Sequence, residues 1–144
     1  MSFTVNVTRR VRLQLWWLTD AEQRELGQFA VETMQKRIRS GIALNDQPAP
    51  ALSGPYAKAK QRRGIPPLRN LTYTGALLNN MQVIETGERI RIGFPDPKQA
   101  IKAGVNQDRV PMIGLSRFDQ QQIVAKHDEL LARSVGDIIR ELVA

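Results

Sequence analysis

The sequence predicts an α+β fold: a small, mostly antiparallel sheet packed by two long helices, with a long basic loop. The helices are predicted because apolar residues recur at helical spacing over 20–39 and again over 117–142. The sheet is predicted because apolar and polar residues alternate over 3–17 and over 81–94. The 144 residues fit a single domain spanning 1–144, with a core large enough to fold without cross-links.

The first expected element is a strand over 3–17, where nearly every odd position is apolar and only Arg9 breaks the alternation. An amphipathic helix would not keep a period of two. Neighbouring residues of a strand face opposite sides, so we expect one of Trp16 and Trp17 to be exposed. Both are candidate subunit contacts. The alternative is a tryptophan at the edge of the protein's own core.

A capping box begins the helix predicted over 20–39. In this motif the Thr19 hydroxyl accepts a hydrogen bond from the third amide of the helix, and Glu22 reaches back to the cap. Three basic residues near the C-terminal end, Arg37 among them, complement the helix dipole. Gly41 is the expected left-handed residue that stops the helix.

Residues 42–67 form the expected extended loop, because five prolines exclude a long regular element. We expect one short helix inside it over 52–61, with Ser53 as its cap and Pro55 in its first turn. A connection of this length in a compact domain is usually functional or partly disordered.

The formal net charge of +7 is unevenly distributed. Residues 1–19 and 47–84 are basic and contain no acidic residue. Such clustering indicates an acidic partner surface or a nucleic acid, and the alternative is solvated charge that favours solubility. Tyr56 in the same loop is another candidate subunit contact. The candidate basic contacts are Lys58, Lys60, Arg62, Arg63 and Arg69.

A short helix and a hairpin are expected over 74–94. Thr74 is the expected helix cap, and Thr86 with Gly87 supplies the hairpin turn. The period of two places the apolar residues on one face of the sheet and the arginines on the other. The apolar set consists of Met81, Val83, Ile90, Ile92 and Phe94.

Two short elements are expected between the hairpin and the last helix. One is a helix over 98–103 that a glycine ends, and the other is an apolar segment over 110–115 interpreted as a possible strand. Ser116 and Asp119 resemble a capping box, with aspartate in place of glutamate, at the start of the helix over 117–142.

The composition argues against several kinds of chemistry. There is no cysteine, and one histidine is too few for most zinc or iron sites. That residue, His127, falls on the apolar face of the last helix and is interpreted as a core histidine, the alternative being a catalytic one. No nucleophile elbow, phosphate-binding loop or metalloprotease motif appears. We therefore expect a protein that is not an enzyme and uses no metal or cofactor.

Targeting signals are also lacking. Arginines interrupt each apolar core that a signal peptide would need, and no apolar run approaches the ~20 residues of a membrane span. We expect a soluble protein made in a cytoplasm, without membrane contact.

Three segments carry a resemblance to a known family. Residues 52–60 read Leu-Ser-Gly-Pro-Tyr-Ala-Lys-Ala-Lys, and residues 71–77 read Leu-Thr-Tyr-Thr-Gly-Ala-Leu. Residues 110–116 read Val-Pro-Met-Ile-Gly-Leu-Ser, and Asp119 follows. In this order and spacing they resemble the phage virion morphogenesis family, which includes Mu-like tail-completion and related neck proteins.

The sequence also departs from the family's pattern. The family's Pro-Ala-Arg-x-Phe motif is replaced at 110–113 by Val-Pro-Met-Ile, so its arginine is missing. The family's His-x-x-Gly stretch, which also contains an aromatic residue, is replaced at 100–104 by Ala-Ile-Lys-Ala-Gly. The segment 3–17 has no counterpart.

The resemblance implies a structural virion protein of the head–tail junction, of the neck, tail-completion or tail-terminator kind, assembled in the host cytoplasm. Such proteins form homo-oligomeric rings, usually hexameric, that cap the tail tube and meet the head-connector or neck proteins. The candidate basic residues would then face genomic DNA in the lumen or an acidic neighbouring ring. From charge alone, the alternative is a sequence-nonspecific nucleic-acid-binding protein.

Overall fold

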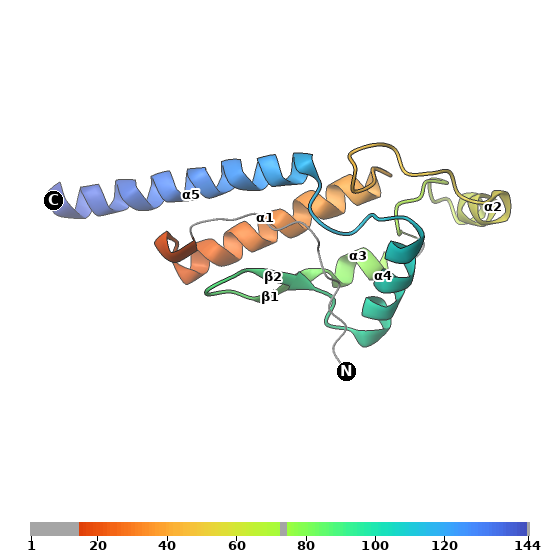
Figure 1. Ribbon diagram of the computed structural model, residues 1–144, viewed down its shortest axis with the longest axis horizontal. Helices are drawn as coiled ribbons and strands as arrows, with labels where there is room; N and C mark the ends of the chain where they lie inside the picture. The colour runs from red at the N-terminus through yellow and green to blue at the C-terminus, as the bar shows by residue number, and fades with distance from the viewer. Residues whose placement is uncertain (1–14, 73–74, 144) are drawn as a thin grey trace.

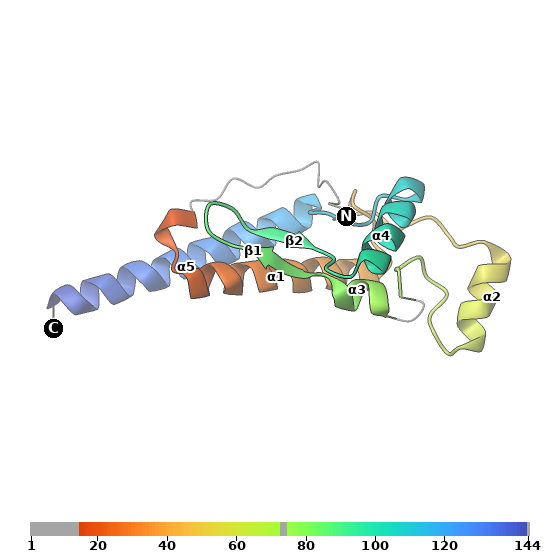
Figure 2. The same cartoon turned by 90° about the horizontal axis from the view of Figure 1, so that it is seen from below.

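The α+β class is confirmed by a computed structural model, which describes residues 15–72 and 75–143. Its two strands form one antiparallel sheet. α1 runs between α5 on one side and the hairpin on the other, and α2 stands at one end of the long axis (Figures 1 and 2). The elements are η1 (Leu15–Trp17), α1 (Asp20–Arg39), α2 (Gly54–Arg62), α3 (Ala76–Asn80), β1 (Gln82–Glu85), β2 (Arg91–Gly93), α4 (Pro97–Arg109) and α5 (Arg117–Val143).

Both predicted ends of α1 are confirmed. The Glu22 amide donates to Thr19 Oγ1 at 3.2 Å, and the Thr19 amide donates to Glu22 Oε1 at 3.0 Å. At the other end, Gly41 has a φ of 74°. The Gly41 amide donates to the Ile38 carbonyl at 2.9 Å, which satisfies one of the carbonyls that a helix end leaves unpaired.

The core consists of two clusters that share α1. Met34 and Ile38 pack with α3, α4 and the hairpin in the first cluster. Leu26 packs with Ile123 and Leu130 of α5 in the second. Because α1 buries residues on two faces, it is the element on which the hairpin and α5 are both assembled.

The hairpin keeps the predicted alternation only in part, because the pairing register shifts between Val83 and Glu85 and Ile84 is exposed. Val83 pairs with Ile92, and both are partly buried against the first core cluster. Gly27 of α1 lets the hairpin lie close against this helix, since a Cβ on it would lie 2.7 Å from Val83 Cγ2. The turn between the strands is longer than Thr86 and Gly87 alone, and the Gly87 amide donates to Gln23 Oε1 of α1 at 2.8 Å.

The end of the predicted N-terminal strand is wrong. Residues 15–17 form a 3₁₀ turn instead, in which the Leu18 amide donates to the Leu15 carbonyl at 2.9 Å. This turn buries Leu18 and delivers the chain directly into the capping box of α1. The rest of the predicted strand, 3–14, lies outside the described residues.

Two helix ends also differ from the prediction. The cap of α3 is Gly75 at a φ of 80°, a conformation that glycine adopts without strain; Thr74 lies outside the described residues. α4 does not stop at Gly104 but continues to Arg109. Asp96 caps its start by accepting from the Lys98 amide at 3.0 Å.

The segment 110–115 is not a strand, because side chains take its backbone groups. Arg37 Nη2 donates to the carbonyls of Met112 and Gly114, each at 2.9 Å. Gln107 Oε1 accepts from the amides of Met112 and Ile113 at 3.0 and 2.8 Å. A segment whose polar groups are satisfied in this way needs no strand partner.

A buried ion pair joins α1 to α5. Arg37 Nε donates to Asp119 Oδ2 at 2.8 Å, and Arg37 Nη1 donates to the Ile42 carbonyl at 2.9 Å. Asp119 also completes the predicted capping box with Ser116, since each accepts from the other's amide at 3.0 Å. The dipole role expected for Arg37 is therefore secondary to a role in the core.

Asp46 adds a second carboxylate at the start of α5, where its Oδ2 accepts from the Phe118 amide at 3.0 Å. Burial raises the pKa of Asp46, but hydrogen bonds from Ser116 and Phe118 and the charge of Arg37 outweigh it, so the pKa is lowered overall. The loop after α1 is thereby tied to α5.

Replacement of Asp119 by alanine should lower the free energy of unfolding by about 3–5 kcal/mol, because the Arg37 charge would stay buried without its partner. Urea denaturation measures this change. The control is Arg24→Gln, which removes the exposed Arg24–Asp20 pair within α1 and should change stability by less than about 1 kcal/mol. Equal effects of the two variants would contradict this role of Asp119.

Gly27→Ala should destabilise the protein by about 1–2 kcal/mol, although alanine favours helices, because the new methyl group would overlap Val83. The matched control is Gly104→Ala in α4, where a Cβ meets nothing within 4 Å and a gain of about 0.5–1 kcal/mol is expected. Thermal denaturation of both variants tests the opposite signs. A stabilised Gly27→Ala protein would refute the close approach.

Candidate functional site

The candidate site is the basic arm, defined as residues 51–70, which contains α2. Figures 1 and 2 show α2 standing away from the rest of the described elements at one end of the molecule. The acid-free stretch of the sequence spans the arm, so positive charge is concentrated on a projecting element.

The short helix predicted in this loop is confirmed as α2, with small differences at its ends. Ser53 occupies the cap position but makes no side-chain capping bond, and Pro55 lies in the first turn as expected. Gly64, at a φ of 71°, ends the helix. The Gly64 amide donates to the Gln61 carbonyl, and the Ile65 amide to the Lys60 carbonyl, each at 3.0 Å.

Lys60 points into the arm, contrary to its expected role as an exposed contact. Its Nζ donates to the Leu68 carbonyl at 2.6 Å and to Asn70 Oδ1 at 2.7 Å, and the residue is 1% exposed. Burial lowers the pKa of this ammonium. The ammonium also lies 5.8 Å from the centre of the Tyr56 ring. Lys60 therefore holds α2 to the returning chain.

Two further side chains attach the base of the arm to the body. Asn70 Nδ2 donates to the Arg39 carbonyl at the end of α1 at 3.1 Å. Arg69 Nε donates to the Pro50 carbonyl at 2.9 Å, so this predicted contact residue braces the loop. These hydrogen bonds fix the base of the arm, while α2 itself projects.

The exposed charge of the arm comes from the other three predicted basic residues, Lys58, Arg62 and Arg63. Ammonium and guanidinium groups at such positions donate hydrogen bonds to carboxylates or phosphates. Tyr56 and Leu68 add apolar surface to the arm, with 42% and 45% of each residue exposed. The arm therefore combines positive charge with apolar contact area.

The predicted tryptophan contacts lie on η1, at the start of α1 and away from α2 (Figure 1). Trp17 is 49% exposed. Trp16 belongs to the same turn, and its side chain lies outside the described residues. The structure thus places Trp17 beside the start of α1 and Tyr56 on the distant α2.

His127 is buried on α5, as predicted, with its Nδ1 3.4 Å from Asp128 Oδ1. Within the described ranges, no cluster of three or more His, Cys, Asp or Glu residues has an arrangement that could hold a metal ion. Likewise, none of the helices described here combines the length and apolar character needed to cross a membrane.

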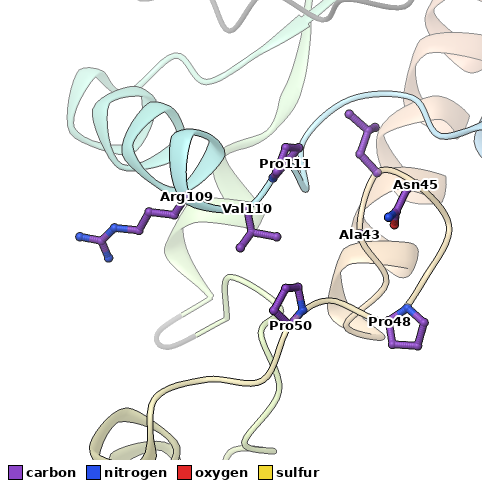
Figure 3. Close-up of a pocket in the computed structure, with 8 residues that line it drawn as sticks. Ala43, Asn45, Pro48, Pro50, Arg109, Val110 and Pro111 are labelled. Carbon is purple, nitrogen blue, oxygen red and sulfur yellow. The ribbon is translucent and has the colours of Figure 1, made fainter.

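A shallow hollow of about 450 Å³, which the sequence did not predict, lies between the loop after α1 and the end of α4. Figure 3 shows the rings of Pro48, Pro50 and Pro111 around it, with Arg109 at one side. The Leu44 amide donates to the Pro111 carbonyl at 3.0 Å, which ties the two walls together. Its lining offers proline surface and one guanidinium.

The comparisons with known proteins found no matching protein-family model, curated protein or solved structure.

Lys60→Ala should loosen the arm, because it removes two hydrogen bonds that close the chain around α2. We expect amide hydrogen exchange over residues 54–70 to become about thirtyfold faster, because two hydrogen bonds with net contributions of about 1 kcal/mol each are lost and about 1.4 kcal/mol corresponds to a factor of ten. Lys58→Ala is the matched control, since this exposed lysine lies on the same helix and its removal should leave exchange unchanged. Unchanged protection from exchange in Lys60→Ala would show that the two Lys60 hydrogen bonds do not hold the arm closed.

Proposed function

We propose that this protein is a structural component of a bacteriophage head–tail junction, a neck, tail-completion or tail-terminator-like protein that acts by assembling into a ring. The observation that carries the proposal is the ordered resemblance of three segments to the phage virion morphogenesis family. The partners in this proposal are further copies of the chain, the tail tube and the head-connector or neck proteins.

Two features of the molecule support an assembly role. The basic arm projects at one end, and α5 extends beyond the start of α1 at the other (Figure 1). A subunit with distinct surfaces at its two ends makes a heterologous contact, which closes into a ring when the rotation between subunits allows it.

The resembling segments also have local structural roles. Residues 52–60 build most of α2, while Gly114 and Ser116 lie beside the Arg37–Asp119 pair. Leu77 of the second segment is buried in the first core cluster. The pattern that resembles the family therefore includes residues that specify this chain's fold.

Light scattering after size exclusion, at micromolar concentration, should give the mass of a closed oligomer, and electron micrographs should show rings. Mass spectrometry of particles purified from a culture infected with the phage that carries the gene should detect the protein in virions or tails. A protein that enters neither particle would refute the proposal.

A second candidate is a sequence-nonspecific nucleic-acid-binding protein, which the exposed charges of Lys58, Arg62 and Arg63 favour. In that case duplex DNA should bind the protein with an affinity that falls steeply with salt, with a log–log slope of about −0.9 for each phosphate neutralised. Binding that is undetectable at low salt would exclude it.

A further inference from the structure

The projecting arm and the region around the start of α1 carry opposite charge. The arm presents Lys58, Arg62 and Arg63 without a neighbouring acid in its sequence. The stretches 20–25 and 126–134, on α1 and α5, form what we call the acidic end. Its charged residues are Asp20, Glu22, Glu25, Asp128 and Glu129, against Arg24, Lys126 and Arg133.

Several carboxylates of the acidic end reach solvent. The side chains of Asp128 and Glu129 are 70% and 60% exposed. Glu25 lies between two cations, with its oxygens 3.1 Å from Arg133 Nη1 and 3.9 Å from Lys126 Nζ. These pairs hold α1 and α5 together and leave an excess of negative charge on their exposed side.

Apolar surface accompanies the charge at both ends. Tyr56 and Leu68 lie on the basic arm, and Trp17 lies on η1, directly before the acidic start of α1. Aromatic side chains surrounded by charge are typical of protein–protein contacts. Two surfaces that both expose aromatic side chains and carry opposite charges favour a head-to-tail contact between copies.

We propose that the basic arm of one copy docks on the acidic end of a second copy, with Tyr56 and Trp17 inside the contact and the opposite charges around it. This inference rests on the proposed ring and names its two surfaces. A two-fold contact of arm against arm is disfavoured, because it would bring like charges together. Repetition of the head-to-tail contact adds subunits in one direction, as ring closure requires.

Charge reversal tests the contact. Arg62→Glu with Arg63→Glu changes the combined charge of the three exposed positions 58, 62 and 63 from +3 to −1, and Asp128→Lys with Glu129→Lys changes the charge of the acidic end from −2 to +2. Each double variant alone should associate about tenfold more weakly or worse at low salt, since like charges would face each other. Masses by light scattering and by native mass spectrometry measure the association.

Two combinations should restore assembly. In an equimolar mixture, the glutamates on the arm of one variant face the lysines on the reversed end of the other, and the remaining arm and end keep their original charges. Native masses should then show both variants in one oligomer. The variant with all four substitutions in one chain should also assemble, because both surfaces are reversed together.

The control is Lys98→Glu with Lys102→Glu on α4, an equal charge change at exposed positions away from both ends. It should assemble like the unaltered protein, and circular dichroism should confirm that every variant is folded.

The outcomes separate this inference from the ring itself. If the unaltered protein forms rings that the reversals do not weaken, the two surfaces are wrong and the ring stands. Assembly lost in the arm variant but restored by neither combination also overturns the contact. Loss of DNA binding in that variant would then assign the arm to nucleic acid. A protein that stays monomeric at every concentration contradicts both the contact and the ring.

Discussion

The guanidinium of Arg37 is the point at which the separate parts of this molecule meet. It bonds the Asp119 carboxylate of α5 and the carbonyls of Ile42, Met112 and Gly114. One side chain on α1 therefore fixes the loop that leaves α1, the irregular segment before α5 and the start of α5. A buried charge is tolerated here because its carboxylate partner and three carbonyls surround it.

In the arm, too, a buried cation joins separate parts of the chain, here the ammonium of Lys60. Among the described residues, the Lys60 ammonium donates to two neutral groups, the Leu68 carbonyl and Asn70 Oδ1. Asn70 in turn bonds the Arg39 carbonyl at the end of α1. The last turn of α1, which carries Arg37, therefore also holds the base of the arm.

Short-range rules predicted several features correctly, although Gly104 does not end α4 and Ser53 makes no side-chain capping bond. The capping boxes of Thr19 and Ser116 and the left-handed Gly41 depend on residues within a few positions of each other, and all are present. Other predictions failed because the hydrogen-bond partner comes from a residue elsewhere in the sequence. The segment 110–115 has the apolar character of a strand, but Arg37 and Gln107 take its backbone groups. Similarly, the pattern around Lys60 does not reveal that its ammonium turns inward.

By itself, the sequence determined the helices, the hairpin and the basic stretch, because periodicity, caps and composition are local properties. Tertiary structure alone decided which charges are exposed: Lys60 and Arg37 are turned inward, while Lys58, Arg62 and Arg63 remain on the surface. It also decided that the basic arm and the acidic end lie apart. The physical reason is that burial depends on partners from distant parts of the chain, and these come together only when α1, α5 and the loops pack.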